Sequence, residues 1–106
     1  MMDGDQALAR DMINAILDQS PENSEGLYMA AVLARYDKDF SAAQKALDKL
    51  LVVVPDFGRA LQEQGHLLRD QGRLPEALTA YRNATVANPA LQASWQAQAK
   101  LLSNKG

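Results

Sequence analysis

The stretch from Gly58 to Leu91 reads GRALQEQGHLLRDQGRLPEALTAYRNATVANPAL. Its apolar and small residues recur at spacings of three and four, which places them on one face of a helix. Gly72 and Pro75 interrupt this pattern, and Pro89 closes it. Glycine suits the left-handed end of a helix, and proline suits the first turn of the next one. The stretch therefore predicts a hairpin of two helices.

The same pattern recurs along the chain. Pro21, Pro55 and Pro89 lie 34 residues apart, and each follows an apolar stretch. Proline cannot continue a helix interior, so each marks a helix end. Five further sets of residues keep this step: Ala9, Ala43 and Ala77; Ile13, Leu47 and Tyr81; Ile16, Leu50 and Ala84; Leu27, Leu61 and Trp95; and Ala31, Gly65 and Ala99. The chain is therefore built from a repeat of 34 residues.

This repeat predicts an all-α fold. The small residues allow two helices to approach closely, with Ala31 opposite Ala43 and Gly65 opposite Ala77. Asp5 and Asp39 are expected N-caps, because their carboxylates can accept hydrogen bonds from free amides. We expect helices at residues 5–19, 24–37, 40–53, 58–71, 74–87 and 92–104.

The spacing resembles that of the tetratricopeptide-repeat family over nearly the whole chain. The copy at 58–91 matches the family pattern at Leu61, Gly65, Leu68, Gly72, Leu74, Ala77, Tyr81, Ala84 and Pro89. The copy at 24–57 matches at Leu27, Ala31, Ala34, Asp39, Phe40, Ala43, Leu47, Leu50 and Pro55. The departures are Lys38 at the turn glycine, and Gln64 and Gln98 at leucine positions, where we expect weaker packing. The resemblance implies a superhelix, or solenoid, of antiparallel hairpins with about six helices.

The register also predicts how the repeats are divided. We expect one domain over 1–106, with full repeats at 24–57 and 58–91 between half repeats at 1–23 and 92–106. In this register Gly4 and Asp5 match the family's turn, so residues 5–19 are a second helix without its first. We therefore expect a fragment of a longer array. It should expose Leu8, Ile13 or Ile16 at one end and Trp95 or Leu102 at the other, and could self-associate there.

Composition excludes several classes of function. The net charge is −2, from 11 basic and 13 acidic residues, so we expect no nucleic-acid partner. No apolar run reaches the roughly 18–20 residues that span a bilayer, so we expect no membrane partner. The absence of cysteine removes disulfides and thiolate metal ligands. We expect a cytoplasmic protein without a cofactor.

Few residues suggest chemistry. His66 is the only histidine, and it is either a ligand contact or a partly exposed surface residue, the interpretation that we favour. The aspartates spaced by two lack the later ligands of a calcium loop, so turn and capping roles are preferred. We expect no catalytic residue and no metal ligand.

The resemblance implies a binding site on the first helix of each repeat, where these proteins hold a partner segment in a concave groove. By register the lining is Glu25, Tyr28, Val32, Arg35, Arg59, Gln62, Glu63, His66, Arg69, Gln96 and Lys100. Its four cations suit an acidic segment, or equally are solvated surface charges. Tyr28 and Val32 replace the lysine and asparagine with which chaperone-binding members clamp a terminal carboxylate, so we do not expect heat-shock chaperone binding.

Two functions remain open. The first is a protein–protein interaction module that binds a partner segment in its groove. The second is a non-catalytic arm of a larger enzyme, because the second half is loosely similar to tetratricopeptide arms of bacterial sulfotransferase fusions. That similarity rests on 65–69, 88–91, and the pair Ser94 and Trp95.

Overall fold

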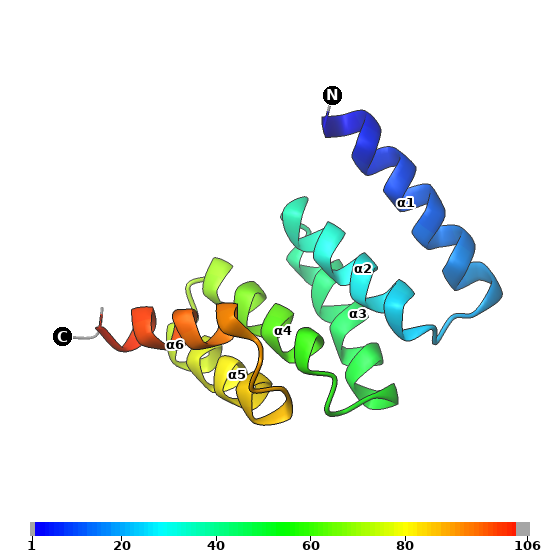
Figure 1. Cartoon of the computed structure of the whole chain (residues 1–106). Helices are drawn as coiled ribbons and strands as arrows, with labels where there is room; N and C mark the ends of the chain where they lie inside the picture. Colours follow the sequence, from blue (N-terminus) through cyan, green and yellow to red (C-terminus); the bar gives the residue numbers. More distant parts are fainter. Residues whose placement is uncertain (1, 104–106) are drawn as a thin grey trace. The chain divides into compact units, whose positions relative to one another are not determined.

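Six helices make up the computed structural model, which describes the backbone of residues 2–103 and the side chains of residues 7–103. There is no strand in this part of the chain, so the predicted all-α class is confirmed. Figure 1 shows α2 beside α3 and α4 beside α5. The helices are α1 (Met2–Gln19), α2 (Ser24–Tyr36), α3 (Phe40–Val53), α4 (Gly58–Asp70), α5 (Leu74–Ala87) and α6 (Gln92–Ser103).

The chain divides into two compact units, Met1–Pro55 and Asp56–Gly106. In the first unit, α2 packs closely against α3 and less extensively against α1. In the second unit, α4 packs closely against α5, and α6 lies mainly on α5. Each unit therefore contains one of the two full hairpins that the repeat predicts, and their union in a single domain stays a prediction.

The helix boundaries follow the prediction closely, with one clear error. Helix α1 begins at Met2, so Gly4 and Asp5 lie within a helix and form neither a turn nor an N-cap. One glycine costs a helix only about 1 kcal/mol relative to alanine, which is too little to stop it. The side chains of residues 1–6 lie outside the described part. Helices α2 and α4 each end one residue earlier than expected, at Tyr36 and Asp70.

Helices α2 and α3 are capped at their N-termini by short polar side chains, whereas Phe57 and Arg73, at the N-caps of α4 and α5, make no such bond. Asp39 accepts a hydrogen bond from the backbone nitrogen of Ala42 at 3.1 Å, which confirms its predicted role. Asn23 caps α2 in the same way, accepting from the backbone nitrogen of Gly26 at 2.8 Å. These bonds fix where α2 and α3 begin.

The two hairpin turns have the same backbone geometry with different residues. Gly72 has a φ of 79° and Lys38, at the same place in the repeat, a φ of 63°. Each turn closes with backbone hydrogen bonds of 2.9 Å, from Lys38 to the carbonyl of Arg35 and from Gly72 to that of Arg69. Lysine in this left-handed conformation is strained because its Cβ approaches the following carbonyl oxygen.

Lys38→Gly is therefore expected to stabilise the protein, by about 0.5–1 kcal/mol, because glycine adopts positive φ without that strain. The reverse change, Gly72→Lys, should destabilise it by a similar amount, since a Cβ at Gly72 meets no atom within 4 Å and only the backbone strain remains. Urea denaturation followed by circular dichroism measures both. Equal stability of Lys38→Gly and wild type would contradict the strain argument.

The hairpin cores are formed by the residues that recur in the repeat. Ala31, Leu47 and Leu50 are fully buried in the first unit, and Ala84 is fully buried in the second. There, Leu68, Ala77, Ala80 and Tyr81 form a cluster on which Ala97 and Leu101 of α6 pack. The periodic spacing thus identifies the buried faces.

Gly65 is a buried glycine whose closest contact is with a residue other than the expected Ala77. A Cβ at Gly65 would lie 2.7 Å from the Tyr81 ring, so the nearest atoms are those of Tyr81 rather than Ala77. The corresponding pair in the first unit, Ala31 and Leu47, is fully buried as well. The second hairpin therefore pairs glycine with tyrosine at the positions where the first hairpin pairs alanine with leucine.

The prediction that the apolar residues of α1 are exposed is partly wrong. Ile13 is buried and Ile16 is half-buried, because this side of α1 packs on α2. A Cβ at Gly26 of α2 would lie 3.0 Å from Ile16 Cγ2, which shows how close the helices are. Leu8, Trp95 and Leu102 are exposed as expected.

Candidate functional site

The expected binding residues of the first unit lie on α2. Glu25 is exposed, whereas Tyr28, Val32 and Arg35 are half-buried. The Arg35 guanidinium lies over the Tyr36 ring, with 4.9 Å from Cζ to the ring centroid. The structure brings Tyr28 and Val32 together in an apolar hollow of about 280 Å³ between α1 and α2, lined by Ala9, Ile13, Tyr28, Met29, Val32, Leu33 and Tyr36.

Three of the expected residues on α4 are used inside the protein. His66 lies with Nδ1 2.7 Å from the Tyr81 hydroxyl, and the two rings meet edge to face at 5.4 Å. Gln62 Oε1 accepts a hydrogen bond of 2.7 Å from the Ser94 hydroxyl. Glu63 is only 3% exposed. Glu63 therefore presents almost no surface to a ligand, whereas Gln62 and His66 are half-buried and each uses a polar atom within the fold.

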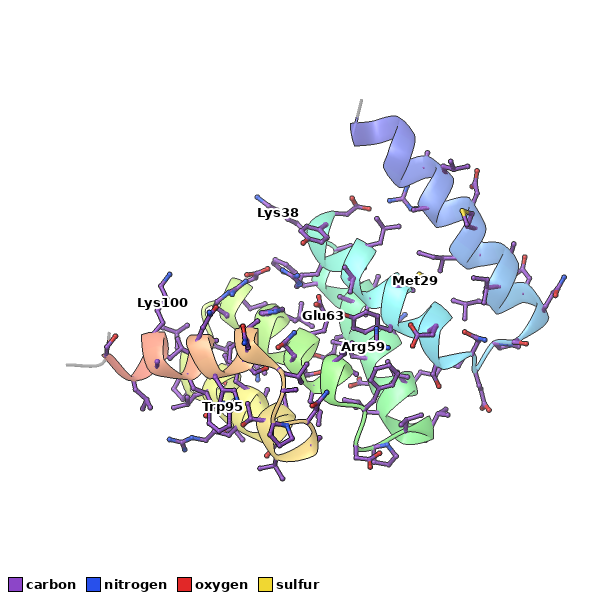
Figure 2. All side chains as sticks on the ribbon, viewed as in Figure 1. Met29, Lys38, Arg59, Glu63, Trp95 and Lys100 are labelled. Carbon is purple, nitrogen blue, oxygen red and sulfur yellow. The ribbon has the colours of Figure 1, made fainter. Side chains whose placement is uncertain are left out.

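The exposed cations among the expected binding residues of the second unit lie at both ends of α4 and on α6. The Arg59 guanidinium stacks over the Phe57 ring at 4.9 Å. Arg69, in the last turn of α4, lies 3.2 Å from the carboxylate of Asp70. Lys100 is exposed and its side chain projects outward from α6 (Figure 2), and Trp95 on the same helix is 51% exposed. Gln96 is exposed on the same helix.

Arg69 and Lys100 come together at a niche of about 280 Å³, which we call the basic niche. Its apolar lining comes from the start of α5 and from α6, namely Leu74, Ala97 and Leu101. Ala97 and Leu101 pack on the core cluster of the second unit, so this lining is held in place. Two cations beside an apolar lining can take an apolar side chain and an adjacent carboxylate.

The sequence did not identify the apolar lining of the basic niche, although one signal was present. Ala97 and Leu101 are four residues apart on α6, next to Lys100, so they lie on one face of the helix beside that cation. The sequence also contained no sign of the hydrogen bonds made by Gln98, and the weaker packing expected there stays a prediction. Gln98 is buried, and its Nε2 donates to the Tyr81 carbonyl at 3.2 Å and the Thr85 hydroxyl at 3.1 Å. Polar bonding replaces the leucine packing at this position.

One exposed ion pair shifts two pKa values near the turn before α5. Arg73 and Glu76 form hydrogen bonds and an ion pair. The hydrogen bond from Arg73 lowers the pKa of the Glu76 carboxyl, and the bond to Glu76 raises the pKa of Arg73. Neither residue lines the basic niche. The described side chains include no group of three or more His, Cys, Asp or Glu that could hold a metal ion.

None of the helices in the described part is both long and apolar enough to cross a membrane. No protein-family model matches the chain. It is 30% identical over 99 residues to "DnaJ homolog subfamily C member 3" of Mus musculus, and likewise to that of Homo sapiens. These matches cover 93% of this chain and 20% of each relative, so the chain spans about a fifth of their length.

Solved structures resemble the chain over nearly its whole length. The "First TPR of Spaghetti (RPAP3) bound to HSP90 peptide SRMEEVD" superposes with a TM-score of 0.85 at 17% identity, covering 97% of this chain and 82% of that one. "MamA MSR-1 C2" superposes with a TM-score of 0.74 at 17% identity, covering 99% and 60%. None of these names mentions a sulfotransferase, and that similarity stays a prediction. The 34-residue repeat, the antiparallel hairpins and these superpositions together show that the chain has the tetratricopeptide-repeat fold.

Proposed function

We propose that this chain is a protein–protein interaction module, and that its second unit captures a partner segment carrying an apolar side chain next to an acidic group. The observation that carries the proposal is the basic niche, in which Arg69 and Lys100 flank Leu74, Ala97 and Leu101. The similar Spaghetti structure holds a peptide that ends in EEVD, an acidic segment with one apolar residue. That likeness supports a peptide ligand of the same general chemistry.

The niche favours a carboxylate over other groups for two physical reasons. An arginine binds a carboxylate through parallel hydrogen bonds, and a nearby lysine adds a point charge. Arg69 already lies 3.2 Å from Asp70, and both side chains are partly exposed. An exposed ion pair of this kind contributes only about 0–1 kcal/mol, so a ligand carboxylate can replace Asp70 at small cost.

The enzyme-arm alternative concerns segments beyond this chain. Within the present residues it shares the same binding chemistry, and no contact in the structure favours it over the interaction module. Tyr28 and Val32, in the apolar hollow of the first unit, also lack the cationic and amide groups of a chaperone clamp. We therefore expect a ligand other than a heat-shock chaperone tail.

Charge reversal in the niche tests the proposal. Random heptapeptides are selected on the immobilised chain, and the strongest acidic–apolar peptide is labelled for fluorescence anisotropy. Arg69→Glu with Lys100→Glu should weaken its binding at least tenfold, because attraction between opposite charges becomes repulsion. The peptide SRMEEVD, measured in the same way, should bind more weakly than the selected peptide.

A matched control separates the niche from net charge. Arg82→Glu with Lys45→Glu makes the same change in charge at exposed cations outside the niche and should leave affinity within about twofold. Helicity by circular dichroism should be equal in all variants. The proposal would be contradicted if the selected peptides lacked acidic residues. It would also be contradicted if the control variant lost as much affinity as the niche variant.

A further inference from the structure

Helix α6 carries a row of exposed apolar side chains. Trp95, Ala99 and Leu102 follow one another at spacings of four and three on α6, and all three are exposed, Trp95 to 51% and Leu102 to 48%. The Trp95 indole nitrogen donates a 2.8 Å hydrogen bond to the Pro89 carbonyl, which fixes the ring while leaving half of it accessible. We call these three residues the α6 stripe.

The register shows what normally covers these positions. In the repeat, Trp95 corresponds to Leu27, which is 4% exposed, and Ala99 corresponds to the fully buried Ala31. Ala31 lies in the hairpin of α2 and α3, where a second helix covers the first. A helix standing over α6, as α3 stands over α2, would cover Trp95 and Ala99.

The first helix has an uncovered stripe of the same length. Leu8, Met12 and Ala15 lie at spacings of four and three on α1, and they are exposed, Leu8 to 62% and Met12 to 60%. They lie one residue before Ala9, Ile13 and Ile16, the set that faces α2, and thus about 100° around the helix. We call Leu8, Met12 and Ala15 the α1 stripe.

We infer that the α1 stripe of one copy packs on the α6 stripe of a second copy, joining the chains head to tail. Helix α1 carries four aspartates and one arginine, a net charge of −3, whereas Lys100 gives α6 a charge of +1. Opposite charges favour α1 against α6 over either helix against itself. The α6 stripe includes a half-exposed tryptophan, one of the residue types most enriched among those that anchor protein interfaces. The α6 stripe shares no residue with the lining of the basic niche, and the two sites have only the charge of Lys100 in common.

Two variants, each altered in one stripe, test this arrangement in the 106-residue chain. Leu8→Glu with Met12→Glu places charge in the α1 stripe, and Ala99→Glu with Leu102→Glu places charge in the α6 stripe. Light scattering up to about 1 mM protein should show wild-type mass rising with concentration and both variants as monomers. Each variant loses association because every head-to-tail contact needs one intact stripe of each kind.

Mixing gives the decisive result. An equimolar mixture of the two variants should form a 1:1 dimer and nothing larger, because one intact α6 stripe can meet one intact α1 stripe. Val52→Glu and Val86→Glu alter exposed valines outside both stripes, so they should associate like wild type. Wild type that stays monomeric, a single-stripe variant that still associates, or a mixture without dimer would each overturn the inference. Circular dichroism confirms that every variant is folded.

Discussion

Gly65→Ala is expected to lower the free energy of unfolding by about 2–3 kcal/mol, because the added methyl overpacks the core. Its Cβ would lie 2.7 Å from Cδ1 and Cε1 of Tyr81, a distance that real Cβ contacts essentially never show. The Tyr81 ring has little freedom to retreat, since it is fully buried and its hydroxyl is bonded to His66. The free-energy cost of this steric overlap should exceed the roughly 1 kcal/mol that a helix gains when alanine replaces glycine.

The first unit supplies the compensating change. Ala31 and Leu47 occupy the places of Gly65 and Tyr81 one repeat earlier, and both are fully buried without the clash. Tyr81→Leu alone should cost about 2–4 kcal/mol, because it removes ring atoms and the bond to His66. Combined with Gly65→Ala, it recreates the pair found in the first unit. The double variant should then be about 1–3 kcal/mol more stable than the sum of the single effects.

Chemical denaturation of wild type, the two single variants and the double variant gives this coupling directly. Ala31→Gly in the first unit is the matched control: it leaves a small cavity rather than an overlap, and Gly65→Ala should not compensate for it. Strictly additive free energies for Gly65→Ala and Tyr81→Leu would show that the ring and the new methyl do not collide.

The sequence predicted the hairpins well because their signals are local. Prolines at intervals of 34 residues, the glycine at Gly72 and the cap at Asp39 each act within one turn of the chain, and the structure confirms these helix ends. The predicted start of α1 was wrong because it, too, was judged from local signals alone. Gly4 and Asp5 resemble a turn locally, yet neither residue is a strong enough breaker to prevent a helix.

The candidate site was less predictable because it depends on contacts between helices. Register placed Gln62 and His66 on the presumed binding face, but their partners Ser94 and Tyr81 lie 32 and 15 residues away. No periodic pattern specifies such hydrogen bonds. The cations were easier to place, and Arg69 and Lys100 do meet at one niche, although its apolar lining was recognised only from the structure.

Gln98 provides the second large expected effect and the clearest difference from the repeat pattern. Gln98→Ala should lower the free energy of unfolding of the second unit by about 2–3 kcal/mol. It removes two buried hydrogen bonds worth about 1 kcal/mol each, and it opens a gap between α5 and α6. The Thr85 hydroxyl keeps its own donated bond of 2.9 Å to the Arg82 carbonyl, so the loss is confined to the contact with α6.

Gln98→Leu separates hydrogen bonding from packing. Leucine, which the repeat pattern favours here, fills the gap but cannot donate to Thr85 or to the Tyr81 carbonyl. It should therefore recover only part of the loss and remain about 1 kcal/mol less stable than wild type. Amide hydrogen exchange of α6, together with urea denaturation, measures both variants. Higher stability of Gln98→Leu than of wild type would mean that apolar packing outweighs these bonds and that the repeat pattern alone was the better guide at this position.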